Sequence, residues 1–447
     1  MSEPLKIFSQ RCWVDGKLQP ATVHIRGSVI SAVNKTFEQD ALDVGDDILM
    51  PGLIDAHVHI NEPGRTDWEG FETATRSAAA GGITTLVDMP LNSSPVTISV
   101  ESLEEKKRAT LGKMQVNIGF YGGLVPANAA HMDAICRSGV LGVKCFLVHS
   151  GIDEFPNTTK EDLELAMPVL AAYRIPLLVH AEIDREPAVS NLDKEPTSYK
   201  EYVKSRPDRW ETEAIDMMIG LCRKYNCPVH IVHVTSAQSL RLIEAARKEG
   251  LPLTAETCPH YLYFDAEHIP DAKTIYKCAP PIRNKANNNR LKEALQTGLL
   301  DFIATDHSPA PPDIKEISSG NLKNAWGGIA GLQFFLPASW TALKGLLSLE
   351  QFIPLVTEKP AAFLRINDRK GYIRPGFDAD LVIWSNGVSV KIREEDILHR
   401  HKACPYTGEF LSGAVQMTMV NGRVVFDSRL EYFDKTEKNA GQWLLQK

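Results

Sequence analysis

The sequence lacks the features that mark several large classes of protein. Its eight cysteines include no CxxC pair, which disfavours a disulfide framework and indicates reduced thiols in a cytosol-like compartment. It has no block of basic residues, and its formal net charge is 49 − 56 = −7. Neither nucleic acid nor a membrane surface is therefore expected as a partner. The expected partner is a small molecule.

Long apolar stretches are also missing. The longest uncharged run, Asn324 to Leu343, contains glycines and Pro337, so no membrane-spanning helix is expected. The first residues mix acidic and basic side chains and hold no apolar core of signal-peptide length. We therefore expect a cytoplasmic protein, and an organelle matrix is left open as an alternative.

Eight short runs of β-branched or apolar residues follow one another along the 447 residues, each bounded by turn residues. Most are separated by stretches with apolar residues three and four positions apart, which is typical of amphipathic helices. Strand and helix repeated eight times predict an α/β protein with a (β/α)8 TIM barrel over residues 51–374. The runs are LIDAHVH, ITTLVDM, VNIGFYG, VLGVKCFL, PLLVHAE, VHIVHVT, PLTAETC and DFIATDH.

The two ends of the chain have a different residue pattern. Residues 5–50 and 376–430 hold short alternating segments with Gly turns, which predict β-hairpins. Neither end is long enough for a core of its own. We therefore expect one small β-sandwich domain built from both termini, with residues 1–50 and 375–447 forming this domain and a C-terminal tail.

Two histidines in the first predicted strand suggest metal chemistry. His57 and His59 are two residues apart, and the two-residue period of a strand sends both side chains to one face. Such a pair also occurs by chance, so alone it is weak support for a metal site.

Further potential ligands lie near the carboxyl ends of other predicted strands. Lys144, His180, His233 and Asp306 fall in the fourth, fifth, sixth and eighth strands. The carboxyl ends of barrel strands form the catalytic rim, whereas random polar residues would fall on both rims and in the helices. The one-sided placement predicts a metal site.

Two of these positions need separate treatment. His230 and His233 are three residues apart, so they should lie on opposite faces of the strand, and we expect only His233 to point inward. The Lys144 amine beside metal cations would be desolvated and repelled, so a neutral or chemically modified lysine is expected.

Other polar residues are assigned lesser roles. We expect Asp55, Glu182 and Glu256 to support the metal ligands by hydrogen bonds without binding the metal themselves. His149 and His260 follow barrel strands but are not expected to bind metal. Surface positions are expected for the remaining histidines, His24, His131, His268, His399 and His401.

Several strings carry a resemblance that spans nearly the whole chain. PGLIDAHVHINEPGRTDWEGFET, GVKCFL, LLVHAE and FIATDHSPA occur in the order found in cyclic amidohydrolases, the group of dihydroorotases, hydantoinases and allantoinases. Within this group HVHINEPGRTDWEGF is similar to the allantoinase family. Dihydroorotases typically carry Arg where this chain has Asn61, to match the carboxylate of their substrate, whereas the ring of allantoin is neutral.

The resemblance implies a centre with two divalent metal ions per subunit. Lys144, carboxylated by carbon dioxide, would bridge both ions as a carbamate. The ions are usually zinc, although cobalt, manganese or nickel serve some members. The resemblance also implies a homotetramer. The other ligands would be His57, His59 and Asp306 on one ion, and His180 and His233 on the other.

The implied reaction is hydrolysis of the hydantoin ring of allantoin to allantoate in purine degradation. A metal-bridging hydroxide would attack, with Asp306 as general base. The alternatives are a dihydropyrimidinase or hydantoinase, a dihydroorotase, and a non-catalytic scaffold relative. Substrate contacts are expected from Asn61, Asn92, Ser150, Cys278 and Ser308.

Overall fold

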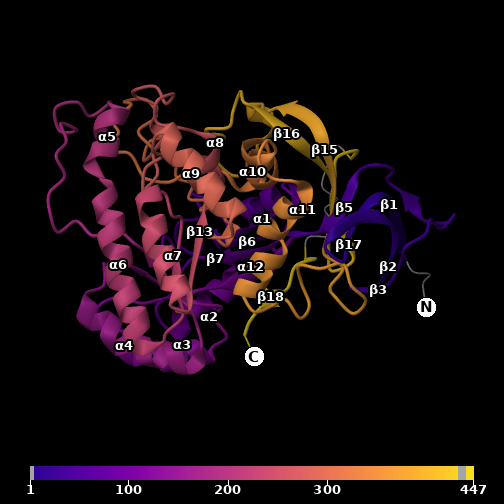
Figure 1. Cartoon of the computed structure of the whole chain (residues 1–447), viewed down its shortest axis with the longest axis horizontal. Helices are drawn as coiled ribbons and strands as arrows, with labels where there is room; N and C mark the ends of the chain where they lie inside the picture. Colours follow the sequence, from indigo (N-terminus) through magenta and orange to yellow (C-terminus); the bar gives the residue numbers. More distant parts are fainter. Residues whose placement is uncertain (1–4, 431–438, 447) are drawn as a thin grey trace.

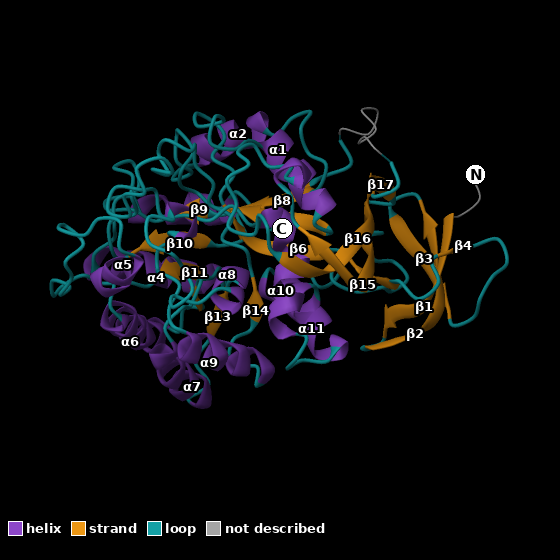
Figure 2. Cartoon of the chain, turned by 90° about the horizontal axis from the view of Figure 1, so that it is seen from above, coloured by secondary structure: helices purple, strands orange, loops and turns teal. Residues whose placement is uncertain are grey.

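The computed structural model describes residues 5–430 and 439–446. It has a barrel wrapped in helices at one end and a twisted, mostly antiparallel sheet at the other (Figures 1 and 2). Among the described residues, no helix is both long and apolar enough to cross a membrane.

Each of the eight predicted runs forms a strand of the barrel wall in the described part of the chain. Neighbouring strands pair in parallel, and the short β9 (Gly122–Gly123) continues the third strand to reach the fourth. The predicted TIM barrel is thus confirmed. Its strands are β6 (Leu53–Val58), β7 (Ile83–Asp88), β8 (Asn117–Phe120), β10 (Val143–Phe146), β11 (Leu177–His180), β12 (Val229–Ile231), β13 (Leu253–Thr257) and β14 (Phe302–Ile303).

The barrel closes between its first and last strands. A parallel bridge joins Val58 to His307, and the His59 N–H donates to the His307 carbonyl oxygen at 2.8 Å. Alternate residues then face inside and outside, as the two-residue strand period requires. Leu178 of β11 lies in a buried cluster with residues of the other strands, whereas Leu177 and Val179 lie in the cluster that includes the helices.

Helices cover the outside of the barrel (Figure 1). α7 shows why they do so, because Leu240, Ile243 and Ala246 are spaced by three and are all buried. Capping boxes at Ser99 and Thr159 satisfy the free N–H groups where α2 and α4 begin. The helices are α1 (Phe71–Ala80), α2 (Val100–Ala109), α3 (Met132–Arg137), α4 (Lys160–Tyr173), α5 (Tyr199–Ser205), α6 (Asp208–Tyr225), α7 (Leu240–Lys248), α8 (Pro259–Tyr263), α9 (Lys285–Gln296), α10 (Phe335–Leu343), α11 (Leu349–Val356) and α12 (Glu358–Phe363).

Both ends of the chain build the second sheet, which confirms the small β domain. The indigo N-terminal strands lie beside the orange and yellow C-terminal strands (Figure 1), and β5 pairs antiparallel with β15, Leu49 opposite Ile383. Residues of both ends share one buried cluster. In the described chain the sheet comprises β1 (Leu5–Val14), β2 (Lys17–Arg26), β3 (Val29–Asn34), β4 (Leu42–Asp43), β5 (Ile48–Pro51), β15 (Leu381–Lys391), β16 (Phe410–Val420) and β17 (Arg423–Asp427).

Part of the expected C-terminal tail lies at the barrel. The strand β18 (Trp443–Leu444) pairs in parallel with Ile118 and Gly119 of β8, at the barrel. The sequence could not reveal this pairing, because a two-residue strand has no readable sequence period. For the rest of the chain we propose domain boundaries near residues 51 and 374.

A buried ion pair connects α2 to the carboxyl end of β7. The Lys106 ammonium lies 2.6 Å from Asp88 Oδ2, with the two side chains 1% and 0% exposed. The Lys106 ammonium also donates to the Met89 carbonyl at 2.9 Å, and Asp88 Oδ1 accepts the Ile60 N–H at 2.8 Å. The pair thus fixes the backbone just after β6, which carries the histidine pair.

Replacing this lysine should destabilise the fold strongly. Lys106→Met leaves the Asp88 carboxylate buried without a counter-charge, so we expect the free energy of unfolding to fall by about 3–5 kcal/mol, measured by urea denaturation. The exposed α7 pair of Lys248 and Glu244 is the control, and Lys248→Met should cost less than about 1 kcal/mol. Equal losses in the two variants would contradict the prediction.

Candidate metal centre

The predicted ligands gather at the carboxyl rim of the barrel. His57 lies in β6, Lys144 in β10 and His180 at the end of β11. The others follow the ends of their strands closely. All six side chains are buried, with residue exposures of 0% to 8%, and they are His57, His59, Lys144, His180, His233 and Asp306.

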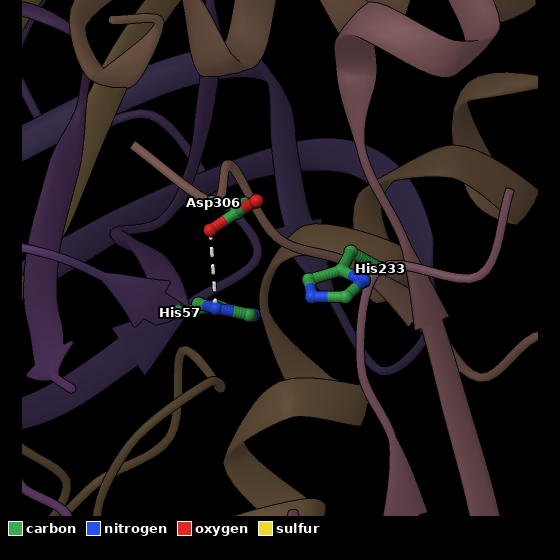
Figure 3. Close-up of side chains that lie close together, drawn as sticks. All are labelled: His57, His233 and Asp306. Atoms are coloured by element: carbon green, nitrogen blue, oxygen red, sulfur yellow. Dashed lines mark ion pairs between the residues drawn. The ribbon is translucent and has the colours of Figure 1, made fainter. Parts of the chain in front are cut away.

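Three of these residues form a compact cluster. His57, His233 and Asp306 each offer one ligand atom, and these atoms lie within 4.8 Å of one another (Figure 3). The Asp306 Oδ1 atom lies 3.2 Å from His57 Nε2 and 3.3 Å from His59 Nε2. The ring of His180 joins from the other side, with its centroid 4.7 Å from that of His233.

Three buried atoms of these side chains have no hydrogen-bond partner among the residues that the structure describes. They are His57 Nε2, Lys144 Nζ and His233 Nδ1. A buried polar atom without a partner costs free energy, and imidazole nitrogens with a carboxylate oxygen are a donor set that suits divalent cations. The residues present therefore fit a divalent metal ion.

The backbone turns two ligands inward at the ends of their strands. His233 has a φ of 39° and Asp306 a φ of 47°, values that are uncommon for residues other than glycine and that gather at functional sites. The prediction that only one of His230 and His233 faces inward was wrong. His230 Nε2 also lies inside, 3.2 Å from Glu256 Oε2, because the positive φ of His233 breaks the two-residue period.

Two buried carboxylates orient the imidazoles, as expected. Glu256 Oε1 lies 2.6 Å from His57 Nδ1, and Glu182 Oε2 lies 2.7 Å from His180 Nε2. Burial opposes ionisation of both carboxyls, but the neighbouring imidazoles, and Arg206 beside Glu182, outweigh it and lower the pKa of each to about 2. Ionised carboxylates only accept hydrogen bonds, so each imidazole donates one N–H and keeps its other nitrogen as a lone-pair donor.

Asp55 acts on the backbone instead of on a ligand ring. Its Oδ1 atom accepts the N–H groups of His57 at 3.2 Å and Thr305 at 3.1 Å, and Oδ2 accepts the Thr305 hydroxyl at 2.5 Å. Burial raises the pKa of Asp55 to about 7. This carboxyl ties β6 to the segment that carries Asp306.

Burial dominates the charge state of the other rim groups. It lowers the pKa of Lys144 to about 8 and that of His59 to about 4. It also lowers the pKa of His180 and of His233. Neutral imidazoles and an amine that loses its proton easily are the forms that bind metal or react as nucleophiles.

A cavity of about 400 Å³ opens over these ligands. Asn92, Ser150 and Ser308, three of the expected substrate contacts, line it. Asn61 and Cys278 do not, although both are buried nearby with exposures of 1%. The Asn61 amide instead donates to the Pro309 carbonyl at 3.4 Å.

Sequence reasoning missed much of the cavity wall. Arg206, Trp210, Lys277 and Trp326 all line it, yet they come from loops or helix ends, where no periodic pattern marks a side chain as facing a site. His399 was also misplaced. It was expected on the surface and is 1% exposed, with its ring centroid 5.7 Å from that of His307.

Known proteins resemble this chain over nearly its full length. A probable allantoinase of Oryza sativa subsp. japonica is 43% identical over 446 residues, covering 94% of this chain and 87% of that protein. The allantoinase of Saccharomyces cerevisiae is 38% identical over 440 residues, covering 94% and 95%. The structure of L-hydantoinase (dihydropyrimidinase) from Arthrobacter aurescens is 30% identical, with a TM-score of 0.90 and full coverage of both chains.

The amidohydrolase family model matches residues 48–425, which include every predicted metal ligand. The curated relatives exceed 30% identity over most of their own length. On these grounds the chain belongs to the amidohydrolase family, within which it groups with allantoinases.

Proposed function

We propose that this protein hydrolyses the hydantoin ring of allantoin to allantoate, a step of purine degradation. The observation that carries the proposal is the buried cluster of His57, His233 and Asp306, with ligand atoms within 4.8 Å of one another, in a chain 38–43% identical to allantoinases. The reaction breaks the ring amide C–N bond and adds water across it.

The six rim residues are our proposed metal ligands. His57, His59 and Asp306 would hold one ion, and His180 and His233 the other. Lys144 would bridge both after its neutral amine forms an N–C bond with carbon dioxide and loses a proton, giving a carbamate anion. Zinc is the proposed metal, as the resemblance implies, and cobalt, manganese and nickel are the alternatives, because imidazole and oxygen donors suit several divalent ions.

Two divalent cations at this site would lower the pKa of a water molecule and polarise the substrate carbonyl. The chain itself moves the proton. Burial opposes ionisation of Asp306, but His57 outweighs it and holds the pKa of this carboxyl well below its usual range. Asp306 is thus a carboxylate that accepts the proton of the attacking water and donates it to the departing ring nitrogen.

Polar side chains on the cavity wall would orient the ring. Asn92 is the proposed amide contact. Its Oδ1 atom is buried and has no hydrogen-bond partner in the described part of the chain, and its Nδ2 lies 3.3 Å from His59 Nδ1. Ser150 and Ser308 line the same cavity. An uncharged amide and hydroxyl groups suit a neutral ring with ureido N–H and C=O groups.

A hydantoinase or dihydropyrimidinase activity is the second candidate. It is favoured by the TM-score of 0.90 with an enzyme of that title, although the identity is only 30%. The same metal centre would serve either ring, so the cavity wall decides the substrate.

An assay against four rings separates these candidates. Protein produced with zinc and bicarbonate should show its highest kcat/KM with allantoin, compared with dihydrouracil, hydantoin and dihydroorotate, and should carry about two metal ions per chain. Preference for dihydrouracil would leave the proposed metal site valid and would contradict allantoin as the substrate. A chain without bound metal would support the scaffold alternative.

The assembly is proposed on resemblance, and the compartment on the cysteine pattern and the composition of the first residues. We propose a homotetramer located in the cytoplasm. One relative, from Aquarana catesbeiana, is titled a mitochondrial allantoinase, so an organelle matrix is the alternative. Light scattering of the purified protein and cell fractionation test the two proposals.

Asp306→Asn should remove most activity and leave the fold intact. The amide keeps the shape of the side chain but cannot accept the proton, so we expect kcat to fall by about 10²–10⁴-fold, measured with metal content on the same sample. Asp153, an exposed residue, provides the control, and Asp153→Asn should keep its activity. An Asp306→Asn enzyme with normal turnover would remove this residue from the mechanism.

Activation by carbon dioxide should follow the ionisation of Lys144. With a pKa of about 8, about a tenth of the amine is neutral at pH 7. At constant dissolved carbon dioxide, the initial rate at which metal-stripped enzyme is activated on zinc addition should therefore rise about tenfold per pH unit below pH 8 and level off above it.

Two variants test which lysine is responsible. Lys144→Arg should show no response to carbon dioxide, and ¹³C-labelled carbon dioxide should give no carbamate signal in its NMR spectrum. Lys277 also lines the cavity, and burial lowers its pKa to about 8. Lys277→Arg should keep the response, and its loss in that variant alone would contradict the carbamate assignment.

A further inference from the structure

Arg206 connects the wall of the cavity to a proposed metal ligand. It follows the last residue of α5, and its side chain lines the cavity with 21% exposure. Its guanidinium carbon lies 5.8 Å from the ring centroid of Trp210. On its other side it meets Glu182, which is fully buried.

The contact between Arg206 and Glu182 is bidentate. Arg206 Nε donates to Glu182 Oε1 at 3.1 Å, and Arg206 Nη2 donates to Glu182 Oε2. Such a fork fixes the plane of a carboxylate, which a single ammonium cannot do. Among the described residues, the ion-pair partners of Glu182 are the imidazole of His180 and this guanidinium.

The same carboxylate holds His180. Glu182 Oε2 lies 2.7 Å from His180 Nε2, so it accepts from the imidazole and from the guanidinium together. A carboxylate held in a fixed plane also fixes the rotation of the imidazole ring. The opposite nitrogen, Nδ1, then carries the lone pair that a cation needs. Phe146 supports this orientation, because its ring stacks on that of His180 at 4.5 Å and 13°.

We propose that Arg206 is a positioning residue, which orients His180 for metal binding through Glu182. This inference rests on the proposed function, in that His180 must hold a cation. It assigns to a residue of the cavity wall a role in metal retention and turnover. A purely structural role, tying the α5–α6 connection to β11, is the competing explanation.

Metal release separates the two explanations. In holoenzyme prepared with zinc and bicarbonate, Arg206→Met should lose metal to a chelator about tenfold faster than the unaltered protein, and Glu182→Gln about 10–100-fold faster. Cobalt-substituted Arg206→Met should show a shifted visible absorption band, because the ligand geometry changes. Its kcat for allantoin should fall while KM changes little.

The chain offers a matched control. On α6, Arg223 makes the same fork with Glu249, at 2.9 and 3.0 Å, but both side chains are about half exposed. Arg223→Met should leave metal release and the cobalt spectrum unchanged. Arg206→Lys keeps the charge but not the fork, so its release rate should fall between those of the unaltered protein and Arg206→Met.

Specific results would overturn the inference. Normal metal release and a normal cobalt spectrum in Arg206→Met, with only a lower thermal stability of the metal-free protein, would establish the structural role. A rise in KM alone would make Arg206 a substrate contact. If the unaltered protein binds metal but does not hydrolyse allantoin, the proposed substrate is overturned and this test remains valid. If the unaltered protein binds no metal, both the proposed function and the role of Arg206 are overturned.

Discussion

The site depends on the seam where the first and last strands of the barrel meet. Asp55 accepts two hydrogen bonds from Thr305, and the His59 N–H donates to the His307 carbonyl. These contacts bring residues that are about 250 positions apart in the chain into one cluster. If the seam opened, Asp306 would move away from the histidine pair and the barrel would lose its metal-binding geometry.

Around this seam, buried charges are used for orientation and not for stability alone. Glu256 and Glu182 lie in an apolar interior where an isolated carboxylate would be very costly. Each is tolerated because it accepts from an imidazole, at 2.6 Å and 2.7 Å respectively. The positive φ angles of His233 and Asp306 also cost conformational free energy. The surrounding strands hold both residues in these conformations.

The sequence allowed the barrel and the rim residues to be predicted, because strand ends carry a regular signal. The prediction failed where that regularity ends. His230 and His233 both point inward, since the backbone at His233 leaves the strand conformation. Arg206 and Trp326 lie in segments without a period, so nothing in their spacing marks them. The buried position of His399 depends on packing between distant segments, which composition does not encode.

The sheet that both ends of the chain share also sets an order for folding during synthesis. Leu49 of β5 pairs with Ile383 of β15, which leaves the ribosome about 330 residues later, or roughly 15–70 s at ordinary rates of translation. Until then one edge of the N-terminal strands has no partner, and such an edge invites pairing with other chains. The newly made protein therefore remains prone to aggregation, and in need of chaperones, even after all the strands of its barrel have been synthesised.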